Sequence, residues 1–285
     1  MQRSIFMIRI VSDTSTLYST TQAKTAGFDV SPLSVTIAGR SYREFDEIGA
    51  EAFVNIIRQG NMPTSSQPAI GEVAALYEQY PDDEILNITI ADGLSGTYQS
   101  AVAAAQMSGN GDKITVLNTR TLCGPHRYMV EKAVQWATAG LSVNEILEKL
   151  NAMMDSTKSF LVPADFEYLR RGGRLSPLVS YVGQAASLSP VMTLTEDGRR
   201  LTIASIRRGF AHAFKYMVKA FEKHGVESGW RFYIVHADAP DQARKAQEIL
   251  QAAFPRCSFE FHPLSPAFIT QGGPGCVAVQ IVKEC

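Results

Sequence analysis

The segment ILNITIADGLSGTYQSAVAAAQM, residues 85–107, decides the fold class. Its first part, Ile85–Ile90, is an apolar run of strand length, and its last part, Thr97–Met107, is an alanine-rich stretch that predicts a helix. The polar and glycine-containing residues between them are typical of a tight turn. A strand, a turn and a helix in this order predict one unit of an open α/β sheet.

The same alternation continues on both sides of this segment through residue 158. Apolar runs predict strands, and stretches with helical periodicity follow them. Regular alternation of this kind indicates a parallel sheet with helices on both faces. The further strands are expected at Ile8–Val11, Leu33–Ile37 and Ile114–Leu117, and the further helices at Glu47–Arg58, Pro68–Tyr80, Pro125–Ala139 and Val143–Met154.

The pattern becomes mixed from residue 159 onward, with a helix that ends at Gly172-Gly173 and a hairpin turn at Asp197-Gly198. We therefore expect an α/β protein of two domains. Residues 1–158 would form an N-terminal domain with a parallel sheet, residues 159–285 a C-terminal domain with a mixed sheet, and a ligand would lie between them. Strands are expected at Ser159–Val162, Phe232–His236, around Phe259 and at Val277–Val282, and helices at Leu178–Ala186, Ala211–Lys223 and Ala243–Phe254.

Length, charge and composition narrow the class of protein. The 285 residues exceed what a single core usually supports, and a net charge of −1 provides no positive field for nucleic acid. The start of the chain lacks a signal-peptide pattern, and no apolar stretch approaches the ~20 residues that span a bilayer. We expect a soluble, cytoplasmic protein without a metal or other cofactor, because its four cysteines show no metal-binding spacing. They are Cys123, Cys257, Cys276 and Cys285.

The turn after the strand at Ile85–Ile90 is the first candidate site. In a parallel sheet it places Ser95 at the carboxyl edge, where ligands bind, and the amides at the start of the next helix favour an anion. The same residues also fit a simple tight turn with a helix cap. A further alternative is a serine hydrolase using Ser95, because Gly93-Leu94-Ser95-Gly96-Thr97 resembles a nucleophile elbow, although Thr97 stands where the elbow has glycine.

A second hydroxyl-rich stretch, Thr64-Ser65-Ser66-Gln67-Pro68, precedes a predicted helix. It fits a capping loop, and it could also offer hydroxyls to the anion expected near Ser95. Neutral donors around a carboxylate favour binding over catalysis, because no evident base stands among them.

Several features of the remaining sequence admit two interpretations. Arg170, Arg171 and Arg174 flank the glycines at the end of a helix, where basic residues complement the helix dipole. The segment Thr270-Gln271-Gly272-Gly273-Pro274-Gly275 fits a sharp turn, and its Gln271 could donate an amide to a headgroup. Cys123 with His126 could form a nucleophile and its base, but a cysteine and a histidine in such positions are more often packing and surface residues. His236 with Asp238 could be half a metal site, but such a pair is more often part of a turn at a strand end, and we predict no metal.

Taken in order, five of these segments resemble the DegV family of bacterial fatty-acid-binding proteins. Each segment alone is weak, whereas five in family order over nearly the whole chain are specific. They are Ile10-Val11-Ser12-Asp13-Thr14-Ser15, Ser65-Ser66-Gln67-Pro68, Gly93-Leu94-Ser95-Gly96-Thr97, Tyr168-Leu169-Arg170-Arg171-Gly172-Gly173-Arg174 and Gly273-Pro274-Gly275.

The resemblance implies a lipid-binding protein that is not itself an enzyme. A long-chain fatty acid such as palmitate would bury its acyl chain in an apolar tunnel and hold its carboxylate at the domain interface. A separate fatty acid kinase would then form the acyl phosphate, and transient membrane contact would fit such a carrier. The resemblance implies headgroup contacts at Ser65, Ser66, Ser95 and Gly96 and a partner or headgroup region at Arg170, Arg171 and Arg174.

One position departs from the family pattern. The family commonly has a histidine two residues before Gly-Pro-Gly, and this chain has Gln271 there. Because glutamine can donate a hydrogen bond but cannot carry charge, the departure puts headgroup binding or productive transfer to a kinase in doubt.

Overall fold

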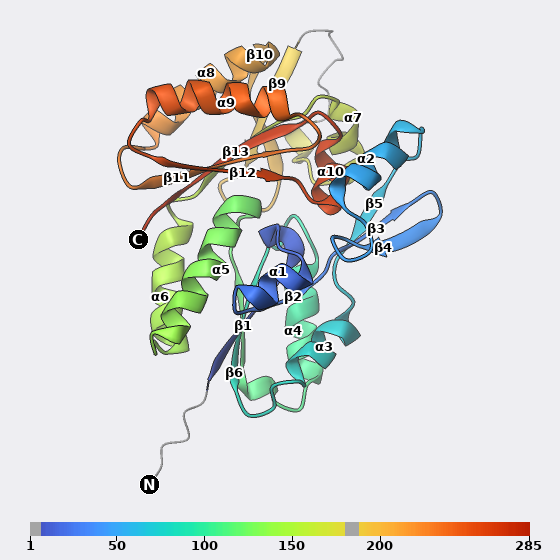
Figure 1. Ribbon diagram of the computed structural model, residues 1–285, viewed down its shortest axis with the longest axis vertical. Helices are drawn as coiled ribbons and strands as arrows, with labels where there is room; N and C mark the ends of the chain where they lie inside the picture. Colours follow the sequence, from blue (N-terminus) through green and yellow to red (C-terminus); the bar gives the residue numbers. More distant parts are fainter. Residues whose placement is uncertain (1–6, 180–187) are drawn as a thin grey trace.

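The computed structural model describes residues 7–179 and 188–285 (Figure 1). Its strands form three sheets, two of them large and one small. Of the helix expected at Leu178–Ala186, residues 180–186 lie outside the described residues, and Pro177–Val179 form a 3-10 turn, η3. No helix in the described ranges is long and apolar enough to cross a membrane.

The N-terminal sheet is parallel throughout, in the order β2-β1-β6-β7, and helices cover both of its faces, as predicted. Val11 and Ile85 pack against α3 and α4 on one face, whereas Ile10 and Leu86 pack against α5 and α6 on the other (Figure 1). Its strands are β1 (Ile8–Asp13), β2 (Asp29–Ser31), β6 (Glu84–Thr89) and β7 (Ile114–Asn118), and its helices are α1 (Thr20–Thr25), α3 (Ile70–Tyr77), α4 (Thr97–Met107), α5 (Cys123–Thr138) and α6 (Val143–Met154), with 3-10 turns η1 (Thr14–Thr16) and η2 (Gly111–Lys113).

A small antiparallel sheet, in the order β4-β3-β5, corrects two predictions. The strand expected at Leu33–Ile37 lies in this sheet and not in the parallel one, because Ala38 and Gly39, both at positive φ, turn the chain back on itself. The stretch around Ser65 is a strand and not a capping loop. The strands are β3 (Ser34–Ile37), β4 (Arg40–Arg43) and β5 (Thr64–Ser66), and α2 (Ala50–Arg58) packs on them.

The C-terminal sheet has six strands in the order β10-β9-β8-β13-β11-β12 and is mixed, as predicted. Only β11 and β12 run parallel to each other, and every other neighbouring pair is antiparallel. The strands are β8 (Lys158–Val162), β9 (Leu188–Leu194), β10 (Leu201–Arg208), β11 (Trp230–His236), β12 (Ser258–Pro263) and β13 (Val277–Lys283), and the helices are α7 (Phe166–Gly172), α8 (Gly209–Lys223), α9 (Pro240–Ala253) and α10 (Pro266–Gly272).

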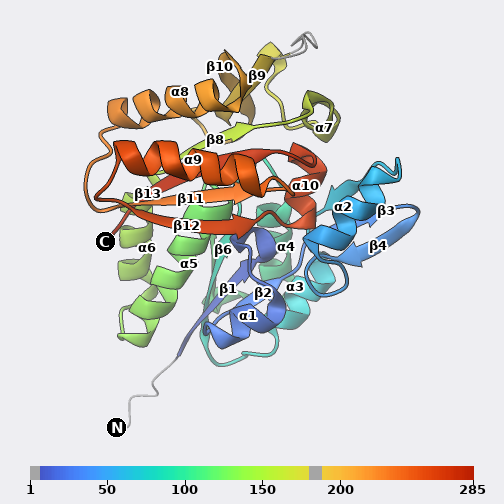
Figure 2. The ribbon, with the colours of Figure 1, turned by 45° about the horizontal axis from the view of Figure 1, so that its top comes forward.

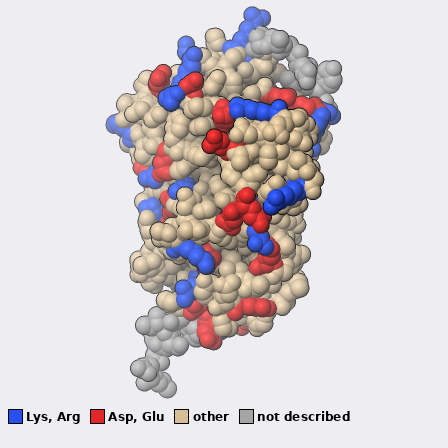
Figure 3. Space-filling model, turned by 45° about the vertical axis from the view of Figure 1, so that its right-hand side comes forward, with Lys and Arg blue, Asp and Glu red and all other residues tan. Residues whose placement is uncertain are grey.

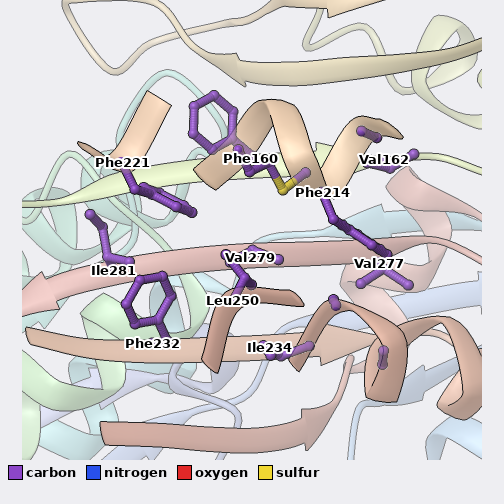
Figure 4. Packing of buried hydrophobic residues seen from close by; sticks show 14 of the residues in the cluster. Phe160, Val162, Phe214, Phe221, Phe232, Ile234, Leu250, Val277, Val279 and Ile281 are labelled. Atoms are coloured by element: carbon purple, nitrogen blue, oxygen red, sulfur yellow. The ribbon is translucent and has the colours of Figure 1, made fainter. Parts of the chain in front are cut away.

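Helices α8 and α9 cover the outer face of this sheet (Figure 2). An aromatic core fills the space beneath them, and Figure 4 shows side chains from the helices and the strands converging there. The rings of Phe160 and Phe221 meet edge to face with centroids 5.2 Å apart, and Phe221 meets Phe232 in the same way at 5.3 Å. Such pairs contribute about 1 kcal/mol each beyond the area that they bury.

The inner face of the six-stranded sheet packs against the N-terminal half of the chain. Tyr233 of β11 and Val282 of β13 share a core with Met129 of α5. The approach is so close that a Cβ on Gly124 would lie 2.1 Å from the Tyr233 ring, so only glycine fits at this position. The six-stranded sheet begins at Lys158, and the division into domains at residue 158 stays a prediction.

A buried carboxyl, that of Glu44, joins three distant segments. It accepts hydrogen bonds from the Thr14 hydroxyl and, at 2.8 Å, from the Ala267 amide at the start of α10. Glu44 has no exposed surface, and burial raises its pKa to about 7. This side chain therefore helps to fix the position of α10 relative to the small sheet.

We expect Glu44→Gln to change how stability depends on pH. The folded chain holds the Glu44 proton up to about pH 7, whereas the unfolded chain releases it near pH 4.5, so the wild-type free energy of unfolding falls as pH rises between these values. The variant lacks this contribution. Urea unfolding at both ends of the window should show the wild type losing on the order of 3 kcal/mol relative to the variant. Parallel pH profiles would contradict the assignment.

Candidate functional site

A cavity lies where the carboxyl edge of the parallel sheet, the small sheet and the inner face of the six-stranded sheet meet. It offers about 140 Å³ to the centres of water-sized atoms, roughly ten times what one water needs. The cavity therefore has room for a chain of atoms. Its apolar wall consists of Leu33, Ile90, Leu94, Leu122, Cys123, Phe160, Leu161, Leu169, Met192, Leu194, Leu201, Leu264, Ala267, Phe268 and Ala278.

One group of polar side chains in the wall comes from β5, the Ser95 loop and α10. Ser65, Ser66, Ser95 and Gln271 all line the cavity, so the structure brings together four residues that were predicted from distant parts of the sequence. Gln271 Nε2 donates to Ser65 Oγ at 3.1 Å. The Gln271 Oε1 atom is buried and has no hydrogen-bond partner among the described residues. Gln271 itself lies in helix α10 and not in the sharp turn that was predicted, because the helix continues to Gly272.

Ser95 stands at the carboxyl edge of the sheet, between β6 and α4, where the sequence predicted it. Its hydroxyl accepts from the Thr97 amide at 3.3 Å and lies 2.7 Å from Thr97 Oγ1. No described histidine forms a hydrogen bond with it, so the elbow-like turn lacks the base that a serine hydrolase needs. Gly96 does not line the cavity; a Cβ there would lie 2.1 Å from Gln67 Oε1, so this glycine makes room for the Gln67 side chain.

The three predicted arginines separate into two groups. Arg170 and Arg171 are exposed on α7, and both pair with Glu167, whose pKa they lower to about 2. Arg174 instead lines the cavity, donates from Nε to the Leu94 carbonyl at 3.1 Å and also donates to the Gly172 carbonyl. Burial lowers the pKa of Arg174, yet an arginine stays charged at neutral pH. One cation therefore borders the cavity beside the Ser95 loop.

Cys123 and His126 do not form a nucleophile and base. Cys123 lines the cavity, but burial raises the pKa of its thiol well above the ordinary value. The His126 ring lies in the core between the hydroxyls of Ser12, 3.0 Å from Nε2, and Ser15, 2.7 Å from Nδ1. Burial lowers the pKa of this histidine, and its contacts identify it as a structural residue of the β1 end.

His236 and Asp238 likewise have other partners. His236 Nδ1 accepts from the Ala239 amide at 3.2 Å, and Asp238 pairs with Arg58 of α2. Within residues 7–179 and 188–285, no three His, Cys, Asp or Glu side chains are grouped so that they could hold a metal ion.

A second polar group in the wall was not predicted. Ser159 of β8 and Gln280 of β13 are paired on neighbouring antiparallel strands and both line the cavity. Gln280 Nε2 donates to Ser159 Oγ at 3.0 Å. The only sequence signal was a polar residue at an alternate position in each of two otherwise apolar strands. Such positions usually face solvent, so the pattern alone could not assign them to a cavity.

Comparisons with known proteins agree with this geometry. The model of the DegV family, described as a family of uncharacterised proteins, matches residues 7–284. A DegV domain-containing protein of Lactococcus lactis is 30% identical over 283 residues, covering 97% of this chain and 99% of the relative. A similar protein of Staphylococcus aureus is 29% identical over 281 residues, covering 96% and 98%.

Among solved structures, the chain resembles a DegV family protein from Thermus thermophilus that is described as binding fatty acid. The TM-score is 0.87 at 28% identity, with 98% of this chain and 100% of the other covered. With 98% of this chain covered, the likeness extends over both halves of the chain.

The buried thiols give a testable expectation that needs no ligand. Cys285 is exposed, whereas Cys123 and Cys276 are buried and their pKa values are raised by burial. Because the thiolate is the reactive form, brief treatment with iodoacetamide should modify Cys285 and spare the two buried cysteines. Peptide mass spectrometry would show this, with urea-unfolded protein as the control in which all four cysteines react. Rapid modification of Cys123 in the folded protein would instead favour an activated thiol.

Proposed function

The chain belongs to the DegV family, and on this premise we propose that it binds one long-chain fatty acid in the cavity between its two halves. The observation that carries the proposal is the distribution of polarity in the wall. Hydroxyl and amide groups from β5, the Ser95 loop and α10, together with the Arg174 guanidinium, line one part of the cavity. Apolar side chains make up most of the remaining cavity wall. This arrangement suits a carboxylate with a long alkyl chain.

The energetics of burial support this ligand class. Each buried methylene contributes about 0.8 kcal/mol, so ten of them contribute about 8 kcal/mol, the free energy of micromolar binding. The headgroup then needs only enough donors to replace its hydration. The fatty-acid-binding relative from Thermus thermophilus, at 28% identity and with the same fold, agrees with the assignment.

The hydrogen bonds indicate how the carboxylate would be held. Since Ser65 Oγ already accepts from Gln271 Nε2, its own proton is free to be donated to a ligand. Ser95 Oγ accepts from the Thr97 amide and lies 2.7 Å from Thr97 Oγ1; with Thr97 as the donor in that contact, the Ser95 proton is also available to a ligand. Arg174 supplies positive charge from the side of the Ser95 loop. In this arrangement Gln271 orients Ser65, and the two serines make the direct contacts.

We further propose that the chain is a carrier and that a separate fatty acid kinase carries out the chemistry. The polar group that lines the cavity offers donors and a cation, but no general base for acyl or phosphoryl transfer. Arg170 and Arg171 are exposed on the helix that precedes Arg174, and they are the residues that we assign to partner contact. We also propose that the protein is cytoplasmic and makes transient contact with a membrane surface. A carrier must collect its lipid from such a surface.

The serines should control affinity for the acid. Native mass spectrometry of the purified protein, followed by denaturing extraction, should find about one fatty acid per chain. Ser95→Ala and Ser65→Ala should each weaken palmitate binding by roughly 10- to 150-fold, the value of one hydrogen bond to a charged group. The matched control is Ser41→Ala, since Ser41 is exposed on β4 and does not line the cavity. A protein that carries no lipid and binds no C14 to C18 acid would refute the proposal.

Gln271 gives a separate test of the carrier step. Glutamine cannot carry the charge that the family's usual histidine can. Gln271→His should therefore raise the rate of acyl phosphate formation when the protein is supplied to a fatty acid kinase that accepts lipid from DegV proteins. The rate per bound fatty acid separates this effect from a change in affinity. A wild-type rate equal to that of the histidine variant would show that the glutamine does not limit transfer.

A further inference from the structure

The polar pair formed by Ser159 and Gln280 lies on the cavity face of an interior part of the six-stranded sheet. Strand β8 runs between β9 and β13, so its edges are covered on both sides. The Phe160 side chain packs into the aromatic core on the other face, where it is 2% exposed, although the residue also borders the cavity. Ser159 and Leu161 therefore share the face that lines the cavity, and the accessible surface of Ser159 opens into it.

The Gln280 amide has only one orientation that satisfies its neighbours. Its Oε1 accepts from the Gly124 amide at 3.1 Å, and its Nε2 donates to the Leu122 carbonyl at 3.0 Å. If the amide were flipped, Nε2 would face the Gly124 amide, so that two donors met, and Oε1 would face the Leu122 carbonyl, so that two acceptors met. The group that faces Ser159 is therefore Nε2, and Ser159 Oγ acts as the acceptor in that 3.0 Å contact.

This arrangement leaves the Ser159 hydroxyl proton without an acceptor among the described residues. The neighbouring Thr193 hydroxyl donates to the Ser159 carbonyl at 2.9 Å and forms no hydrogen bond with Ser159 Oγ. The Cys123 thiol in the same wall stays protonated, because burial raises its pKa, and is a weak acceptor. The wall thus presents the Ser159 hydroxyl as a hydrogen-bond donor that has no acceptor among the described residues.

The donor lies away from the headgroup region. Leu161 Cδ1 is 3.9 Å from the Cβ position of Gly272, the residue after Gln271. Ser159 is two residues farther along β8, about 6.6 Å from Leu161 at the usual rise of a strand. A ligand with its carboxylate at Ser65 and Ser95 would pass Ser159 along its chain.

We infer that Ser159 makes this cavity select long-chain acids that carry an oxygen substituent, such as a hydroxyl, part of the way along the chain. The inference rests on the proposed function and deepens it. An unsubstituted alkyl chain would displace water from Ser159 and leave its proton unpaired, whereas a chain oxygen would accept it. We expect a preference of about tenfold for the best-placed hydroxyl, the value of one neutral hydrogen bond at its upper range.

The test compares octadecanoic acid with a series of mid-chain monohydroxylated octadecanoic acids, by isothermal titration calorimetry on delipidated protein. At least one hydroxylated acid should bind the wild type about tenfold more tightly than the unsubstituted acid. In Ser159→Ala, and in Ser159→Cys, which keeps the shape but donates weakly, the ratio of the two affinities should fall to about one. Because the ratio is taken within each variant, a general loss of stability cancels.

Ser95→Ala is the matched control, because it should weaken binding of both acids and leave their ratio unchanged. Equal or weaker binding of every hydroxylated acid by the wild type would overturn the inference while leaving fatty acid binding intact. A preference that persists in both Ser159 variants would overturn it as well. Failure of every acid to bind would instead overturn the proposed function, and the inference with it.

Discussion

The buried carboxyl of Glu44 is the contact on which the geometry of the cavity depends. It holds Thr14, at the end of the first parallel strand, and Ala267, at the start of α10. Thr14 in turn accepts from the Leu33 amide at the entry to the small sheet, and that sheet carries Ser65. Glu44 thus ties together the supports of Ser65 and Gln271, two residues more than 200 positions apart that lie within hydrogen-bonding distance.

The sequence predicted those parts of the fold that local periodicity encodes. Helices such as α4 and α6 and the strands beside them were found because their apolar spacing is regular, and Ser95 followed from its position after a strand. The small sheet was not recognised as a separate unit, because strands of three or four residues are too short to show a period. Gln271 was assigned to a turn because the glycines after it conceal the short helix that it belongs to.

The charged residues at the site show the same limit of prediction from local sequence. The sequence predicted one basic cluster of Arg170, Arg171 and Arg174, but a helix and a turn direct them differently, and Glu167 pairs with the first two. Acidic and basic side chains are likewise interspersed over the face shown in Figure 3, in keeping with the net charge of −1. Which arginine enters the cavity depends on the chain's path after Gly173, at positive φ, and that path is a tertiary property.

The position of β13 has a consequence for how the protein is made. Residues 277–283 form a strand in the interior of the six-stranded sheet, between β8 and β11. The parallel sheet can close once residue 118 has left the ribosome, whereas β8 and β11 expose unpaired backbone N–H and C=O groups until the last of their partners is synthesised. Because Ala278 and Gln280 of β13 line the cavity, its wall is complete only after β13 has been translated.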